Sequence, residues 1–381
     1  MRRIARRQVI VGSAAVALAN SVSPFAVAAT GWTPVTPADA GFAPDLDARL
    51  DDVVHSGRAR NVHGILIARR GRMVAERYYE GDDQVRINDG KTEPGRVAFT
   101  ADRRHELRAV TKSIVGLLYG IALSEGKVPP LDQPLLAQFP QYTDLPDMAQ
   151  RRLWTIRHAI TMTLGMDWNE EISYDDPRNG QTAMEAAPDR YRYVLEQPIV
   201  AVAGQRWIYS GGATALVGKI IANGTGRSLP DYARAVLFDP LGIGETVWRV
   251  GGDGETNAAS GLGMLPRDLA RIGQMVLDGG KADGRQIVPA DWLEAAFKPA
   301  VRINDRRQYG YHWYLGEVAF KGLEGPRKER WVGAIGNGGQ RLFVFPGLEL
   351  MLVITAGNYN QRDQGSPPER VITDVVLPNI R

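Results

Sequence analysis

The chain has 381 residues, of which 44% are apolar, so it can bury a large core as one domain or as two smaller ones. It contains no cysteine, which excludes disulfide bonds, a thiol nucleophile and a cysteine-ligated metal site. The 46 basic and 43 acidic side chains nearly balance, and four of the arginines lie in residues 1–28. The remainder therefore gives no electrostatic reason to expect nucleic acid or an anionic membrane as a partner.

Residues 1–28 have the pattern of a signal peptide. Arginines precede an apolar run, Val9–Ala19, and the sequence Ala-Val-Ala at 26–28 matches an A-x-A cleavage site. The pair Arg6 and Arg7 resembles a twin-arginine signal. The run is too short and too interrupted for a stable membrane anchor. We therefore expect a periplasmic or secreted protein.

Two strands are predicted near the start of the mature chain, His63–Arg69 and Met73–Tyr79, joined by a turn that contains Gly71. The polar stretch 82–100 is predicted to be a long loop. Apolar residues then recur at spacings of three and four, which predicts a helix that begins near Ala109 and is buried on one face.

Helices are predicted to dominate the middle of the chain, and strands its end. The expected helices are 153–162, 213–223, 229–238, 264–277 and 289–297, and the expected strands are 311–315, 330–335, 341–345 and 349–355. Strands at both ends imply a sheet assembled from both termini. We therefore expect an α/β domain, residues 29–102 and 245–381, interrupted by a mainly helical region, residues 103–244.

The segment Leu-Arg-Ala-Val-Thr-Lys-Ser at 107–113 resembles the Ser-x-x-Lys motif of the serine β-lactamase and penicillin-binding protein superfamily, but Ala109 stands at the serine position. The first turn of a helix offers unpaired N–H groups at the positive end of the dipole, and Lys112 lies one turn above position 109. The resemblance implies a nucleophile at 109 and a base at 112. A literal Ser-x-x-Lys at 124–127 falls at a helix end and contains glycine, so we do not expect it to be catalytic.

A second motif, Tyr-Ser-Gly at 209–211, resembles the Tyr-x-Asn element of the same superfamily, with Gly211 where asparagine usually stands. A tyrosine that titrates near about 10 and a lysine that titrates near about 10.4 can share a proton. Tyr209 and Lys112 would thus form the proton-transfer pair of a Ser/Lys/Tyr mechanism. The missing asparagine weakens the case for strict amide specificity.

The stretch Trp-Val-Gly-Ala-Ile-Gly-Asn-Gly-Gly-Gln at 331–340 resembles the strand that carries Lys-Thr-Gly or His-Thr-Gly in the superfamily. With Trp331 in place of that cation, we expect short esters or uncharged amides, and not penicillins, as substrates. The oxyanion hole is expected to combine the N–H of Ala109 with that of Ala334 or Ile335. The residues expected to line the substrate site are Trp331, Gly333, Gly336, Gly338, Gln340, Tyr174 and His312.

These resemblances imply a β-lactamase/DD-peptidase-like fold, an antiparallel sheet flanked by helices plus an all-helical domain, with the site between them. The superfamily includes class C β-lactamases, carboxylesterases and nylon-oligomer hydrolases. We expect an esterase or amidase acting through an acyl-enzyme, made inactive by Ala109, on a small-molecule or short-peptide ester or amide. Two alternatives are a natural pseudoenzyme and a β-lactamase or D-Ala-D-Ala peptidase. No cofactor is expected, and the five histidines lack ligand spacing, which predicts no metal site.

Overall fold

The fold was obtained as a computed structural model, which describes residues 32–86 and 92–381. The predicted signal peptide, residues 1–28, lies outside the described residues. None of the helices within the described ranges is long and apolar enough to cross a membrane.

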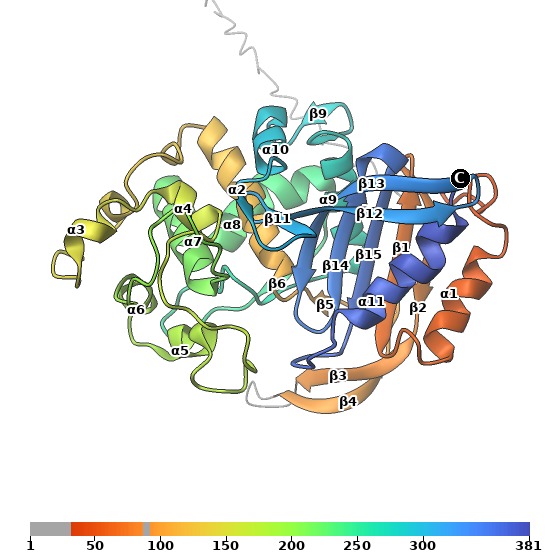
Figure 1. Cartoon of the computed structure of the whole chain (residues 1–381), viewed down its shortest axis with the longest axis horizontal. Coiled ribbons are helices and arrows are strands. Elements are labelled where there is room, and N and C mark those ends of the chain that lie inside the picture. Colours follow the sequence, from red (N-terminus) through yellow and green to blue (C-terminus); the bar gives the residue numbers. More distant parts are fainter. Residues whose placement is uncertain (1–31, 87–91) are drawn as a thin grey trace, which may run out of the picture.

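An eight-stranded antiparallel sheet forms the centre of the larger half of the molecule (Figure 1). Its order is β10-β11-β12-β13-β14-β15-β1-β2, so the N-terminal strands pair with the C-terminal ones. The bounds are Val62–Arg69 for β1, Arg72–Tyr78 for β2, Val301–Arg302 for β10, Arg307–Tyr309 for β11, Tyr314–Gly322 for β12, Gly325–Gly336 for β13, Gln340–Phe345 for β14 and Leu350–Ala356 for β15. The expected assembly of one sheet from both ends of the chain is therefore correct.

Helices cover both faces of this sheet (Figure 1). Because side chains alternate along a strand, Ile65 and Ile67 of β1 pack towards α1 (Leu46–His55), while Leu66 packs on the opposite face, towards α9 (Pro266–Leu277). The chain after α11 (Ser366–Arg370) shares the α1 face. Every residue of β1 is buried, which explains its nearly continuous apolar sequence.

The smaller half is mainly helical and lies beside the sheet, to the left in Figure 1. Its long helices, α2 (Val110–Ser124) and α7 (Gly211–Thr225), pack on one another, and α2 also contacts β13. The remaining helices of the described chain are α3 (Met148–Arg151), α4 (Ile156–Ile160), α5 (Gly180–Ala186), α6 (Arg190–Leu195), α8 (Leu229–Ala233) and α10 (Ala290–Ala296). Short strands join the two halves: β5 (His105–Glu106), β6 (Val247–Trp248) and β7 (Leu262–Met264), while β8 (Lys281–Ala282) and β9 (Arg285–Gln286) form a separate hairpin.

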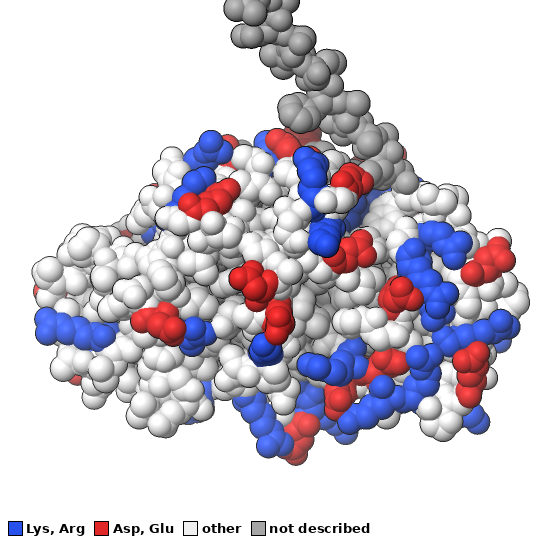
Figure 2. All heavy atoms as spheres, turned by 90° about the horizontal axis from the view of Figure 1, so that it is seen from above, with Lys and Arg blue, Asp and Glu red and all other residues white. Residues whose placement is uncertain are grey.

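The predicted fold class, an antiparallel sheet flanked by helices in the β-lactamase/DD-peptidase-like arrangement, is confirmed. The proposed domain limits at residues 103 and 244 stay a prediction. Figure 2 shows acidic and basic side chains interspersed over one face of the molecule, in keeping with the near balance of charge in the sequence.

The predicted long loop at 82–100 is wrong. The structure has a hairpin there, β3 (Glu80–Arg86) and β4 (Thr92–Ala98), with residues 87–91 outside the described part of the chain. Arg96 pairs across it with Glu80 at 2.6 Å and with Asp82 at 3.6 Å. Opposite charges on facing positions support these strands, and a search for apolar alternation does not detect them.

Candidate active site

Ala109 lies at the start of α2, where the chain turns sharply. The Leu107 N–H donates to the Leu262 carbonyl of β7 at 2.8 Å, and Arg108 has a left-handed backbone, with φ of 51°. The Arg108 guanidinium lies 4.5 Å from the centre of the Tyr359 ring, which helps to hold this unfavourable conformation. Among the hydrogen bonds of the described residues, none is donated by the Ala109 N–H. That group is free to bind a developing oxyanion.

Lys112 and Tyr209 meet beside Ala109. The Lys112 side chain is 2% exposed, and its Nζ donates to the Ala259 carbonyl at 3.0 Å and lies 4.8 Å from the centre of the Tyr209 ring. Burial lowers the pKa of Lys112 from its ordinary value, although the charge of Glu170 partly opposes this. Burial also raises the pKa of Tyr209 well above its ordinary range. The structure therefore brings the two side chains of the predicted proton-transfer pair together.

Ala109 opens into two neighbouring clefts. The first has a volume of about 460 Å³ and is also lined by Tyr209 and Ile335. The second has a volume of about 420 Å³ and extends along α5. Both are lined by Tyr174 and Asn337, so Ala109 lies where they meet. A group attached at position 109 could therefore have one part in each cleft.

The end of β13 forms one wall of the first cleft. Pairing of β13 with β12 stops at Gly333, and beyond it Ile335 and Gly336 line the cleft. A Cβ added to Gly336 would lie 2.6 Å from the Leu107 carbonyl oxygen, so only glycine lets the strand approach α2 this closely. Ala334 is fully buried and does not line the cleft. Of the two candidates for the second oxyanion N–H, the structure favours Ile335.

Two of the predicted substrate-binding residues on β13, Trp331 and Gly333, lie outside both clefts. The Trp331 ring stacks on Phe343 at 4.9 Å between centres, and the same Phe343 ring fills the space beside Gly333. Trp331 shares a face with Ile335, but it lies four residues, about 13 Å, farther along the strand. The turn after Gly336 is short. The cleft is therefore lined by the last residues of β13, Ile335 and Gly336, and not by the triplet 331–333 that the motif indicated.

Three other predicted substrate-binding residues are also displaced from the clefts. The Gln340 amide is buried, accepting from the Ala356 N–H at 3.1 Å and donating to Asn337 O at 3.2 Å. Gly338 faces the Tyr359 ring. His312 is 1% exposed and packs behind α2, where the Ser113 hydroxyl donates to its carbonyl at 2.6 Å. Of the predicted substrate-binding set, Gly336 and Tyr174 line a cleft.

Charged residues of the first cleft were missed from the sequence, among them Arg341 and Glu170. Arg341 on β14 faces Ile335, is 4% exposed, and donates to the Gln340 carbonyl at 2.9 Å. Burial lowers its pKa to about 10, and the charge of Glu369, which is paired with Arg307 at 3.0 Å, partly opposes this. Glu170 accepts from Trp168 Nε1 at 2.6 Å and from the Tyr174 hydroxyl at 2.9 Å. A charge in the otherwise apolar run 341–345 was the available signal for Arg341.

Comparison with known proteins shows the family to which the chain belongs. Residues 46–372 match the model of the β-lactamase family, so the chain belongs to this family. Its fold is that of the family's serine hydrolases, which include enzymes of amidase and esterase type.

One curated relative is the 6-aminohexanoate-dimer hydrolase of Paenarthrobacter ureafaciens, 25% identical over 284 residues. The match covers 69% of this chain and 64% of that protein, so it spans less than two thirds of the relative's length. Two solved structures share the fold. EstCE1, described as a hydrolase with promiscuous acyltransferase activity, has a TM-score of 0.64 at 15% identity, covering 86% of this chain and 98% of its own. The octameric penicillin-binding protein homologue of Pyrococcus abyssi has a TM-score of 0.60 at 17% identity, covering 86% and 76%.

The buried His312 ring predicts a measurable dependence of stability on pH. Burial, aided by the charge of Lys112, lowers its pKa to about 3. The unfolded chain therefore binds a proton between pH 6.5 and 3 that the folded chain does not, and stability falls as pH falls through this range by about 1.4 kcal/mol per unit. Substitution His312→Asn, which tolerates the left-handed backbone at this position (φ 60°), should lower the dependence of the unfolding free energy on pH by this amount, as measured by urea unfolding at several pH values. Burial also lowers the pKa of His63, so part of the dependence remains.

The control is His55→Asn, since the His55 side chain is exposed. An equal slope between pH 6 and 4 in the parent and in His312→Asn would contradict the prediction.

Proposed function

We propose that this chain is the scaffold of a hydrolase for small linear esters or amides, and that Ala109 occupies the position of its nucleophile. As written, it binds such molecules without turning them over. The observation that carries the proposal is that Ala109 lies where the two clefts meet, that Tyr209 lines the first of them beside it, and that the buried Lys112 amine lies 4.8 Å from the centre of the Tyr209 ring.

With serine at 109, the reaction follows from the neighbouring groups. The hydroxyl oxygen attacks the substrate carbonyl carbon, and its proton passes to the pair formed by Lys112 and Tyr209. The N–H groups of Ala109 and Ile335 are placed to stabilise the oxyanion. The bond to the leaving group then breaks, the leaving group takes the proton, and water hydrolyses the acyl-enzyme by the same route. The lowered pKa of Lys112 supports this, because a neutral amine is needed to accept a proton.

Substitution Ala109→Ser should create activity. We expect hydrolysis of p-nitrophenyl acetate to rise by ~10³-fold or more over the parent chain, in line with the losses measured when serine nucleophiles are removed. The parent should be no faster than its Lys112→Ala variant. Labelling by a fluorophosphonate probe should appear only with serine at 109.

The matched control is the double variant Ala109→Ser with Lys112→Met, which keeps the new hydroxyl and removes the base. If Ala109→Ser folds and stays inactive, the proposal of a trapped enzyme fails. A natural pseudoenzyme, the alternative, is then favoured if the parent chain still binds an ester or a short peptide.

The clefts also point to the kind of substrate. The two hollows that meet at Ala109 suit a molecule with an arm on each side of the bond to be cleaved. Arg341 lines the first cleft as a buried cation, and the nearby Glu369 forms its own ion pair with Arg307 at 3.0 Å. Because a buried guanidinium is stabilised by an anionic partner, we propose that one arm carries a carboxylate. This replaces the expectation of uncharged substrates, which depended on Trp331.

The carboxylate proposal predicts a selective change in affinity. In the Ala109→Ser background, Arg341→Gln should raise KM for mono-p-nitrophenyl adipate by about 10-fold or more, since a charge-assisted hydrogen bond is lost, and should leave p-nitrophenyl hexanoate nearly unchanged. The control is Arg362→Gln, an exposed arginine of the same cleft. Equal effects of both variants would mean that Arg341 acts only by general attraction of negative charge, and would contradict a specific carboxylate site.

Arg341 also gives the β-lactamase alternative its specific support, because penicillins carry a carboxylate. Faster turnover of nitrocefin than of the adipate ester by Ala109→Ser would favour that alternative. We expect the reverse, because Gly211 replaces the asparagine and β13 supplies no cation to the cleft.

We further propose that the protein is exported through residues 1–28 in the folded state. The support is the twin-arginine pattern of the sequence. Changing Arg6 and Arg7 to lysine should leave the uncleaved chain in the cytoplasm of a bacterial host, as seen by fractionation and N-terminal sequencing. The same change at Arg2 and Arg3 should not. Export that is insensitive to Arg6 and Arg7 would exclude this route.

A further inference from the structure

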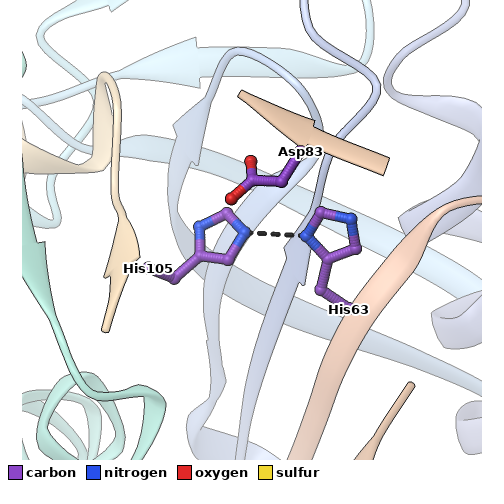
Figure 3. A group of neighbouring side chains, drawn as sticks. All are labelled: His63, Asp83 and His105. Atoms are coloured by element: carbon purple, nitrogen blue, oxygen red, sulfur yellow. Dashed lines mark hydrogen bonds between the residues drawn. The ribbon is translucent and has the colours of Figure 1, made fainter. Parts of the chain in front are cut away.

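Three polar side chains from separate strands converge outside the clefts (Figure 3). His63 comes from β1, Asp83 from β3 and His105 from β5. The two histidines are 0% and 3% exposed, and Asp83 is half-buried. One potential ligand atom from each of the three lies within 4.8 Å of the others. The sequence shows no ligand spacing here, because the fold alone brings residues 63 and 105 together.

The hydrogen bonds of His63 determine which of its nitrogens carries hydrogen. Its Nε2 lies 3.1 Å from the Asp82 carbonyl oxygen and 3.3 Å from Asn61 Oδ1. The Asn61 amide is oriented by donating to the Asp82 carbonyl at 2.9 Å and accepting from the Asp82 N–H at 2.7 Å. Both neighbours of Nε2 are therefore acceptors, so Nε2 must donate. The Nδ1 atom of the neutral ring is left with a lone pair.

The same reasoning applies to His105. Its Nδ1 lies 3.0 Å from the Glu106 carbonyl oxygen, which can only accept, so Nδ1 carries the hydrogen. Its Nε2 then has a lone pair as well. This atom lies 2.9 Å from Nδ1 of His63, as the dashed line in Figure 3 marks. Two lone pairs that face each other at this distance repel, and a positive species between them would remove the repulsion.

A shared proton is one such species, but it would place an imidazolium in a buried site where the His63 ring stacks on Phe99 at 3.9 Å. A divalent metal ion accounts for more of the observations. It accepts both lone pairs and the carboxylate of Asp83, of which Oδ1 already accepts from the Tyr359 hydroxyl at 2.9 Å. In metal-binding histidines, the nitrogen that does not bind the metal commonly donates its hydrogen to a carbonyl or carboxylate oxygen, and both histidines have this arrangement here.

We propose that Nδ1 of His63, Nε2 of His105 and the Asp83 carboxylate bind a divalent transition-metal ion, with Zn²⁺ as the best match and water as the fourth ligand. Bonds of about 2.0–2.1 Å in a tetrahedral site place the ligand atoms about 3.4 Å apart. The two imidazole nitrogens must separate by about half an ångström, and the half-buried Asp83 must move inwards. Its partial exposure gives the ion a route from solvent.

Such an ion would connect β1, β5 and the hairpin of β3 and β4, close to the segment of chain that leads to Ala109. His105 precedes Ala109 by four residues, and Tyr359, bonded to Asp83, lies next to Asn360 of the cleft wall. The ion would thus be structural, holding the segment that leads into α2. It touches neither cleft, so this inference is independent of the proposed hydrolase function.

The test uses the full chain after treatment with EDTA, titrated with ZnCl₂ by calorimetry. We expect one equivalent to bind, and Tm to rise by about 3 °C or more at a Zn²⁺ concentration 100 times Kd, because the ion binds only the folded state. Asp83→Asn should weaken binding by about 10-fold or more. Asp82→Asn is the matched control, since it makes the same change one residue away, where the exposed carboxylate faces Arg96 at 3.6 Å.

Absence of stoichiometric binding and of a Tm shift in the parent chain would overturn the proposal, as would equal losses in Asp83→Asn and Asp82→Asn. Co²⁺ added to the unaltered chain supplies a measurement that does not depend on either variant folding. The intense d–d absorption of four-coordinate Co²⁺ is the expected result, and the weak spectrum of the six-coordinate aqua ion contradicts it.

Discussion

Burial of the Lys112 amine is the constraint on which the rest of the site depends. An ammonium group taken out of water is costly, so a buried lysine persists where the neutral form is useful or where a partner offsets the cost. Here the direct partner is one carbonyl oxygen, that of Ala259, and the Tyr209 ring covers the amine. This environment suits an amine that exchanges a proton with a neighbour. This environment of Lys112 is present although position 109 has no hydroxyl to supply that proton.

The strands β1, β2, β14 and β15 and the long helices α2, α7 and α9 could be predicted from the sequence because their patterns are local. The strand expected at 311–315 is wrong over residues 311–313, since β12 begins only at Tyr314. The apolar runs of β1 and β15 and the spacing of α2 report burial directly. The hairpin of β3 and β4 could not be found this way, because Arg96 and Glu80 stabilise it by charge. Its two strands are close in the chain and pair with each other, but they carry no apolar alternation.

The residues of the candidate site also divide into those that sequence motifs reveal and those that they do not. Ala109, Lys112 and Tyr209 were recognisable because each belongs to a short motif next to a helix start. The wall formed by β13 was placed four residues too early, since a motif gives the identity of a strand but not where its hairpin turns. The position of Arg341 opposite Ile335 depends on the register of β13 and β14, and the contact of His63 with His105 depends on how two separate sheets pack, so neither is visible before the fold is assembled.

The peptide between β15 and α11, residues 357–365, supplies Asn360, Gln361, Arg362 and Gln364 to the first cleft, yet it belongs to no strand or helix. Its anchors reach distant parts of the chain: Asn358 Nδ2 donates to the Arg60 carbonyl at 3.1 Å, and the Tyr359 hydroxyl donates to Asp83 Oδ1 at 2.9 Å. Because the Tyr359 ring also contacts the Arg108 guanidinium, exchange of the whole peptide would disturb the start of α2. A redesign of which molecules the scaffold admits should therefore keep this backbone and change single exposed side chains on it, such as that of Arg362.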